Sequence, residues 1–311
     1  MREFGCPKFP KNFIKSFDGF LKHSQLFTYE QVSSYYKILA EDELHIRKRL
    51  DVNRDYFRVF SDCNNAMDMQ YSIHLEKIIT FLREYMPNLS ELSLRYCPTV
   101  LTLANLIQLA SVTPNLAALD LSQMCDKPHF KKDAIHALAY FRNLKILKLD
   151  GFIARKNAGR GCAHRVEVPP IKQLRNLEVL EMAYQQDTLS RILFSLRESQ
   201  SILFNLKRVY FGVQHCSAVY PELLIWFLRA HRSLVSVNIY NALFATSDQL
   251  RRFYNALMLL PLLMELRLDS CTSCDRIDST IQMQFLKAMS SKGVVQEGTV
   301  RSMRFDPDSN Q

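Results

Sequence analysis

The sequence predicts an α/β solenoid, a right-handed superhelix with parallel strands on its concave face and helices on its convex face. Two observations predict this fold. A short apolar phrase recurs seven times at a nearly constant spacing, and the segments between its copies have the apolar periodicity of helices. One strand and one helix cannot bury an apolar face alone, whereas stacked copies share a continuous core.

The recurring phrase consists of a leucine, two residues, an apolar residue, one residue and another apolar residue. Successive first leucines are separated by 27, 28, 33, 29, 28 and 29 residues. Side chains alternate between the two faces of a strand, so the apolar positions predict the inward side of a short strand. The seven copies are Leu89-Leu92-Leu94, Leu116-Leu119-Leu121, Leu144-Leu147-Leu149, Leu177-Leu180-Met182, Leu206-Val209-Phe211, Leu234-Val237-Ile239 and Leu263-Leu266-Leu268.

The segments between the strands predict helices, because their apolar residues recur three and four positions apart. A final helix is expected over Ile281 to Met289. The groups with helical spacing are Leu103, Leu106, Ile107 and Ala110; Leu189, Ile192, Leu193 and Leu196; Leu223, Leu224, Phe227 and Leu228; and Leu250, Phe253, Tyr254 and Leu257.

Two further positions complete the pattern. Asparagine precedes the first leucine in five copies, and Cys97 and Cys271 follow the last apolar position by three residues. The resulting L-x-x-L-x-L-x-x-N/C resembles the leucine-rich repeat, in the long form of ribonuclease-inhibitor-like proteins and of the repeat domains of F-box proteins. The resemblance spans Leu89 to about Met289 and implies that the cysteine position turns inward, toward backbone groups at the strand's exit. The other copies have different residues there: Met124, Phe152, Gln185, Gln214 and Ala242.

The chain divides into three predicted parts. Residues 1–88 are a mostly helical N-terminal cap, residues 89–289 hold about seven leucine-rich repeats, and residues 290–311 are a C-terminal tail. A solenoid needs a cover at each end of its core. Within the cap we expect helices over Glu43 to Leu50 and Ile73 to Leu82, and a degenerate strand over Phe57 to Phe60.

The 33-residue step contains a basic loop insertion at 151–170, where glycines and prolines replace a helix. Insertions on one face of a solenoid often form part of its binding surface. This loop suits an acidic segment or a phosphate group. A solvated loop without a ligand is the alternative interpretation. Its basic residues are Arg155, Lys156, Arg160, His164 and Arg165.

The sequence contains no motif of a known catalytic class: no P-loop, no nucleophile elbow and no HExxH. Cys271 and Cys274 have the spacing of half a zinc site. A structural zinc needs four ligands, and no second pair stands nearby. We therefore expect no enzyme activity, no metal and no cofactor.

The strand register identifies the residues of the concave face as those that alternate with the inward leucines. Six of them are acidic and four are basic, so this face is mildly acidic although the chain carries a net charge of +9. The surplus positive charge is expected on the cap, the basic loop and the convex helices. The predicted binding residues are Glu91, Arg95, Asp120, Lys148, Asp150, Glu181, Arg208, Tyr210, Asn238, Tyr240, Glu265 and Arg267, with Ser122 and Asp269 on the same face.

These features predict a non-catalytic scaffold that holds another protein on its concave face, since interface cores favour Tyr and Arg. Nucleic acid is not expected there, because it requires a continuous basic stripe. The alternative is nucleic-acid binding through the basic N-terminal segment and the loop at 155–165. The resemblance to F-box proteins implies a narrower role, substrate recognition for a ubiquitin ligase through an adaptor protein.

The expected location is the cytoplasm, with the nucleus as the alternative. The N-terminal residues have no apolar core of a secretory signal. The longest apolar stretches are near ten residues and include one with Pro261, whereas a membrane span needs roughly 20.

Overall fold

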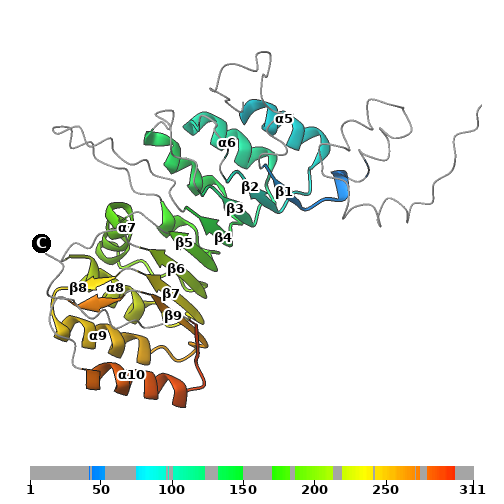
Figure 1. Cartoon of the computed structure of the whole chain (residues 1–311). Coiled ribbons are helices and arrows are strands. Elements are labelled where there is room, and N and C mark those ends of the chain that lie inside the picture. The colour runs from blue at the N-terminus through cyan, green and yellow to red at the C-terminus, as the bar shows by residue number, and fades with distance from the viewer. Residues whose placement is uncertain are drawn as a thin grey trace, which may run out of the picture.

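The computed structural model shows an open sheet of parallel strands with helices along its outer side (Figure 1). It describes residues 42, 44–52, 75–95, 97, 101–122, 132–149, 170–182, 186–212, 219–240, 242–269, 271–273 and 279–297. Within these residues the sheet has nine strands in the order β1-β2-β3-β4-β5-β6-β7-β9-β11. The sheet curves so that the strands line the concave side of an arc and the helices its convex side.

The strands pair in one register that keeps the repeated leucines level. Leu92 is opposite Leu119, Leu119 opposite Leu147, and Leu147 opposite Leu180. All four side chains are buried, as predicted. The strands are β1 (Arg49–Asp51), β2 (Glu91–Ser93), β3 (Ala118–Asp120), β4 (Ile146–Lys148), β5 (Val179–Met182), β6 (Arg208–Gly212), β7 (Ser236–Tyr240), β9 (Glu265–Asp269) and β11 (Val295–Glu297).

The helices follow the predicted apolar spacing, and their apolar residues face the sheet. Between β4 and β5 the described residues contain only a three-residue 3₁₀ turn, and 151–169 lie outside the described residues. A short parallel pair, β8 (Leu243–Phe244) and β10 (Thr272–Ser273), lies outside the main sheet. The helical elements are α5 (Leu75–Tyr85), α6 (Leu103–Val112), 3₁₀ helix η1 (Lys132–Tyr140), 3₁₀ turn η2 (Ile171–Gln173), α7 (Gln186–Glu198), α8 (Val219–Ala230), α9 (Ser247–Met258) and α10 (Ser279–Ser291).

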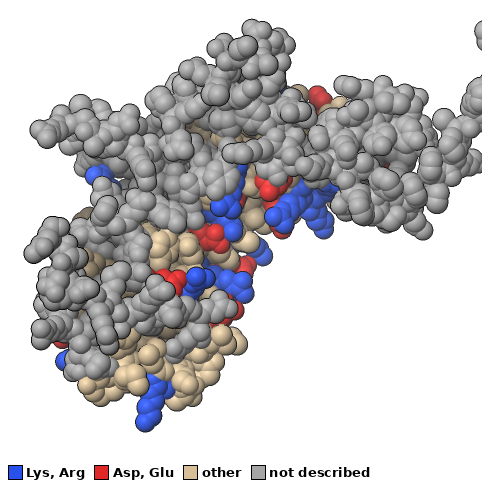
Figure 2. All heavy atoms as spheres, in the orientation of Figure 1, with Lys and Arg blue, Asp and Glu red and all other residues tan. Residues whose placement is uncertain are grey.

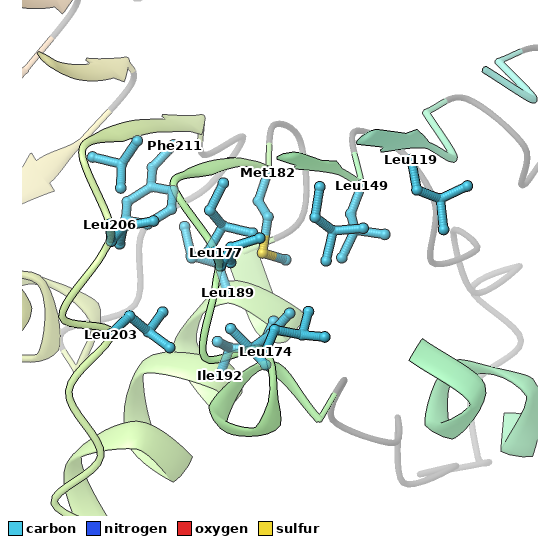
Figure 3. Packing of buried hydrophobic residues seen from close by; sticks show 14 of the residues in the cluster. Leu119, Leu149, Leu174, Leu177, Met182, Leu189, Ile192, Leu203, Leu206 and Phe211 are labelled. Carbon is cyan, nitrogen blue, oxygen red and sulfur yellow. The ribbon is translucent and has the colours of Figure 1, made fainter. Parts of the chain in front are cut away.

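The core lies between the sheet and the helices and runs through successive repeats. In Figure 3, Leu177, Met182 and Phe211 extend from the strand side toward Leu189 and Ile192 of α7. All five side chains are buried. Burying one such side chain stabilises the fold by roughly 1.5–3 kcal/mol relative to leaving it exposed.

The sheet continues past both predicted ends of the repeat region. The expected helix over Glu43 to Leu50 is wrong at its C-terminal end, because Arg49–Asp51 form β1 and pair in parallel with β2. Leu50 and Val52 are both buried, and this alternate burial is that of a strand. The expected strand over Phe57 to Phe60 lies outside the described residues.

At the other end, the predicted tail includes β11, which pairs with β9. Gly293 allows this return to the sheet, because its φ of +72° lies in the left-handed region that glycine readily adopts. The amide of Val294 then donates to the carbonyl of Met289 at 3.1 Å, a hydrogen bond that closes the end of α10.

In three successive repeats the asparagine joins its turn to the preceding one. Asn143 Nδ2 donates to the carbonyl of Pro114 at 2.9 Å, and Asn176 Nδ2 donates to that of Arg142 at 3.0 Å. Asn205 makes the equivalent bond to the carbonyl of Arg175 at 3.0 Å. The recurrence of asparagine therefore reflects a hydrogen bond between neighbouring repeats.

A buried histidine, His231, joins two repeats at the end of α8. Its Nε2 accepts a hydrogen bond from the amide of Leu203 at 3.1 Å, so Nδ1 carries the proton and donates to the carbonyl of Phe227 at 2.8 Å. The ring is fully buried and stacks on that of Phe227 at 4.0 Å. Burial lowers the pKa of His231 from 6.5 to about 4, although the hydrogen bond to Phe227 acts in the opposite direction.

We predict that this histidine makes the fold sensitive to mild acid. Between pH 6.5 and 4 the unfolded chain binds a proton at His231 and the folded chain does not. The stabilising effect of the neutral ring is therefore complete above pH 6.5 and is lost as the pH falls toward 4, by roughly 3 kcal/mol in all. Urea unfolding at successive pH values should show this loss in the wild type. It should be smaller in His231→Gln, and identical slopes in the two proteins would contradict the prediction.

Candidate functional site

The concave side of the sheet carries the predicted binding residues that the structure describes. Glu91, Arg95, Arg208, Glu265 and Arg267 are exposed. The remaining described members are half-buried between neighbouring strands: Asp120, Lys148, Glu181, Tyr210, Asn238 and Tyr240, together with Asp269. Figure 2 shows Lys, Arg, Asp and Glu side chains intermixed along the strand side of the arc.

The other residues predicted for the binding surface are either buried or outside the described part of the chain. Ser122 is 4% exposed, so its assignment to the concave surface is wrong. Ser122 follows the C-terminal end of β3, so the alternation of side chains along a strand no longer predicts which way its side chain points. Asp150 and the basic loop residues Arg155, Lys156, Arg160, His164 and Arg165 lie outside the described residues.

Charges on the concave face are largely paired with one another. Lys148 Nζ lies 2.9 Å from Glu181 Oε2, across two strands that the register places side by side. Arg267 Nε lies 2.7 Å from Asp269 Oδ2, and Arg49 Nε lies 3.7 Å from Glu91 Oε2. Exposed pairs of this kind contribute about 0–1 kcal/mol each. Their main effect is to leave a surface with little net charge.

An apolar row crosses the middle of this face. Ala118 of β3, Ile146 of β4 and Val179 of β5 are register partners, and all three are half-buried. Sequence reasoning placed them on the concave face but did not identify them as a row, because they are far apart along the chain. Glu91 and Arg208 are the next residues of the same row on either side.

Two tyrosines lie further along the same face, on β6 and β7. The ring centroids of Tyr210 and Tyr240 are 5.5 Å apart. The ring of Tyr240 also lies over Gly212, since a Cβ atom at Gly212 would be only 2.0 Å from Tyr240 Cζ. The register pairs Gly212 with Tyr240 across the two strands. Glycine thus provides the space that this aromatic ring occupies against β6, a role that the sequence does not reveal.

The two repeat cysteines turn inward, as the resemblance implies. Cys97 Sγ donates to the carbonyl of Val52, and Cys271 Sγ to that of Ile239 at 3.5 Å, in each case one repeat back. Burial, and secondarily the charge of Asp51, raise the pKa of Cys97 to about 12. The described cysteines are therefore structural thiols. Cys274 lies outside the described residues.

The described residues contain neither a metal-binding cluster nor a membrane-spanning helix. No group of three or more His, Cys, Asp or Glu side chains in these segments is arranged to hold a metal ion. None of the helices in the described ranges is both long and apolar enough to cross a membrane.

The chain matches no protein-family model and no curated protein. Among solved structures it is similar to internalin C2 from Listeria monocytogenes, at 17% identity over 76% of this chain and 77% of that one, with a TM-score of 0.39. It is also similar to a protein from Bacteroides fragilis, at 12% identity over 69% of this chain and 67% of that one, with a TM-score of 0.35. TM-scores below 0.5 indicate only a loose similarity of backbone structure.

The class of the protein follows from its repeats. Seven copies of the leucine phrase, one parallel sheet in continuous register, helices on the convex side and inward cysteines define a leucine-rich-repeat solenoid.

We predict that Gly212→Ala displaces the Tyr240 ring, because the new methyl group and the ring cannot occupy the same space. The substitution should cost about 1–3 kcal/mol of unfolding free energy. In a Tyr240→Ala background it should cost little, which gives a coupling of about 1 kcal/mol or more between the two sites. Denaturant unfolding of the four proteins measures this coupling. Equal costs in both backgrounds would show that the ring does not lie on Gly212.

Proposed function

We propose that this protein is a non-catalytic scaffold that binds a partner protein on the concave face of its sheet. The observation that carries the proposal is the apolar row Ala118–Ile146–Val179 together with the Tyr210–Tyr240 pair on the same face, bordered by exposed charges. Interfaces between proteins have this organisation, with an apolar and aromatic centre and a polar rim.

The dimensions of the face support a macromolecular partner. Neighbouring strands are about 4.8 Å apart, so nine strands make a surface roughly 40 Å long. Acidic and basic groups are intermixed on it, and several of them are paired, whereas a nucleic-acid backbone is bound by an excess of positive charge. A protein surface of mixed charge is the better match.

Narrower versions of the proposal depend on other features. Substrate recognition for a ubiquitin ligase rests on the resemblance to F-box repeat domains. Affinity purification without enrichment of cullin-ligase adaptors would contradict this narrower role.

The alternative of nucleic-acid binding through the N-terminal segment and the loop at 155–165 concerns residues outside the described part of the chain. It predicts an affinity that falls steeply with salt.

The test is a comparison of two triple variants by proximity labelling. The first, Tyr210→Ala/Tyr240→Ala/Arg267→Ala, removes side chains of the concave face. The second, Tyr140→Ala/Arg251→Ala/Lys287→Ala, removes exposed side chains of the convex layer. We expect specific partners to be lost, by about tenfold or more, only from the concave variant, because truncating a central interface residue commonly costs 1–2 kcal/mol or more.

Circular dichroism should show both variants folded, because none of the six side chains is fully buried. Retention of every partner by the folded concave variant would place binding elsewhere.

A further inference from the structure

A second surface runs along the edge of the solenoid where each helix turns into the next strand. Four successive turns place Arg142, Arg175, Phe204 and Arg232 at equivalent positions, each one residue before the side chain that bonds to the preceding repeat. Those bonding side chains are Asn143, Asn176, Asn205 and Ser233. The bonds hold the turns against one another, so the four positions are neighbours along one edge. We call these four residues the turn edge.

The aromatic member of the turn edge is the least covered apolar side chain of its repeat. Phe204 is 77% exposed, while its neighbours Leu203 and Leu206 are 3% and 0% exposed. A phenylalanine left in water forgoes the favourable free energy of burying its ring. Nothing in the described part of the chain covers it, and the core of the repeat is complete without it. Its side chain is available to a ligand.

Basic side chains flank Phe204 along the turn edge. Arg142, Arg175 and Arg232 are exposed, and no ion pair among the described residues involves them. On the adjacent row, Glu178 binds both Lys145, at 3.3 Å, and Lys207, at 2.8 Å. The hydrogen bonds from Lys207 and then Lys145 lower the pKa of Glu178 from 4.5.

Five cations and one carboxylate therefore lie on these turns. Part of the surplus positive charge is here, which corrects the expectation that it lies only on the cap, the basic loop and the convex helices.

Beyond Arg232 the edge becomes apolar. In the next turn Leu259, Leu262 and Met264 are 58%, 55% and 63% exposed. This turn is attached to the previous repeat, since the amide of Met264 donates to the carbonyl of Val235 at 2.8 Å. Exposed apolar groups gathered beside charged ones are typical of protein-binding surfaces.

We propose that the turn edge binds an extended acidic segment of a partner protein. Its carboxylates would pair with Arg142, Arg175 and Arg232, since guanidinium groups bind carboxylates in a bidentate manner. Its apolar side chains would cover Phe204 and, beyond Arg232, Leu262 and Met264. Nucleic acid fits this surface less well, because Glu178 would face the phosphates and the apolar end would face a charged backbone. This surface lies outside the concave face and does not depend on the function proposed above.

The experiment selects ligands without assuming a sequence. A random 16-residue peptide library displayed on phage is panned on the full chain, and the enriched peptides are labelled for fluorescence polarisation. We expect enriched peptides with a net negative charge and at least one large apolar residue. Their affinity should fall with rising salt, because exposed charge pairs are screened.

Five variants locate the binding. Arg175→Glu/Arg232→Glu should weaken the peptides about tenfold or more, and Phe204→Ser several-fold. The matched controls Arg251→Glu/Lys287→Glu and Met283→Ser change exposed residues of α9 and α10 and should leave the affinity within about twofold. Arg175→Gln/Arg232→Gln repeats the test without reversing charge.

Four results would overturn the proposal. The first three are enriched peptides without acidic character, equal weakening by the control variants, and a labelled 20-nucleotide single-stranded RNA that binds the edge more tightly than the peptides. Fourth, if the concave triple variant alone weakens the peptides, the turn edge is excluded while the concave scaffold stands.

Discussion

The level stacking of the repeated leucines is the constraint on which the rest of the structure depends. No single repeat can bury its own strand and helix, so Leu119, for example, is covered only because Leu92 and Leu147 lie in register on either side of it. The same register completes the backbone hydrogen bonds of each strand. An arc of this kind gains stability from each interface between neighbouring repeats, and its ends must be closed by something other than another identical unit.

This constraint also creates the surface available for binding. A strand that turns one side chain into the core turns the next one out, so every buried row is accompanied by an exposed row at the same level. The apolar row through Ile146 is aligned across strands, and Tyr210 meets Tyr240 diagonally across β6 and β7, because the buried residues between them are aligned. The turns are stacked for the same reason, and Phe204 lies among arginines from other repeats. Both proposed surfaces are thus consequences of one register.

Polar groups on the turns and inside the solenoid join repeat to repeat. The turn asparagines, the thiols of Cys97 and Cys271, and the ring of His231 each satisfy a backbone group of the neighbouring repeat. A buried backbone group without a partner costs about 1–3 kcal/mol, so these contacts fix the spacing that the apolar core alone would leave loose. They also assign structural roles to residue types that elsewhere serve as nucleophiles or metal ligands.

The sequence by itself determined the repeat, the buried leucines and most of the convex helices, because each depends on local periodicity, whereas the inward direction of the cysteines followed from the resemblance to the leucine-rich repeat. Only the tertiary structure decided which residues become neighbours across repeats. β1 and β11 were missed because three-residue strands have too little pattern of their own and form by pairing with β2 and β9. The sequence did not reveal the close fit of Tyr240 on Gly212, nor the position of Phe204 between arginines of neighbouring repeats. The physical reason is the same for both: about 30 residues of chain separate side chains that the stacking of repeats brings together.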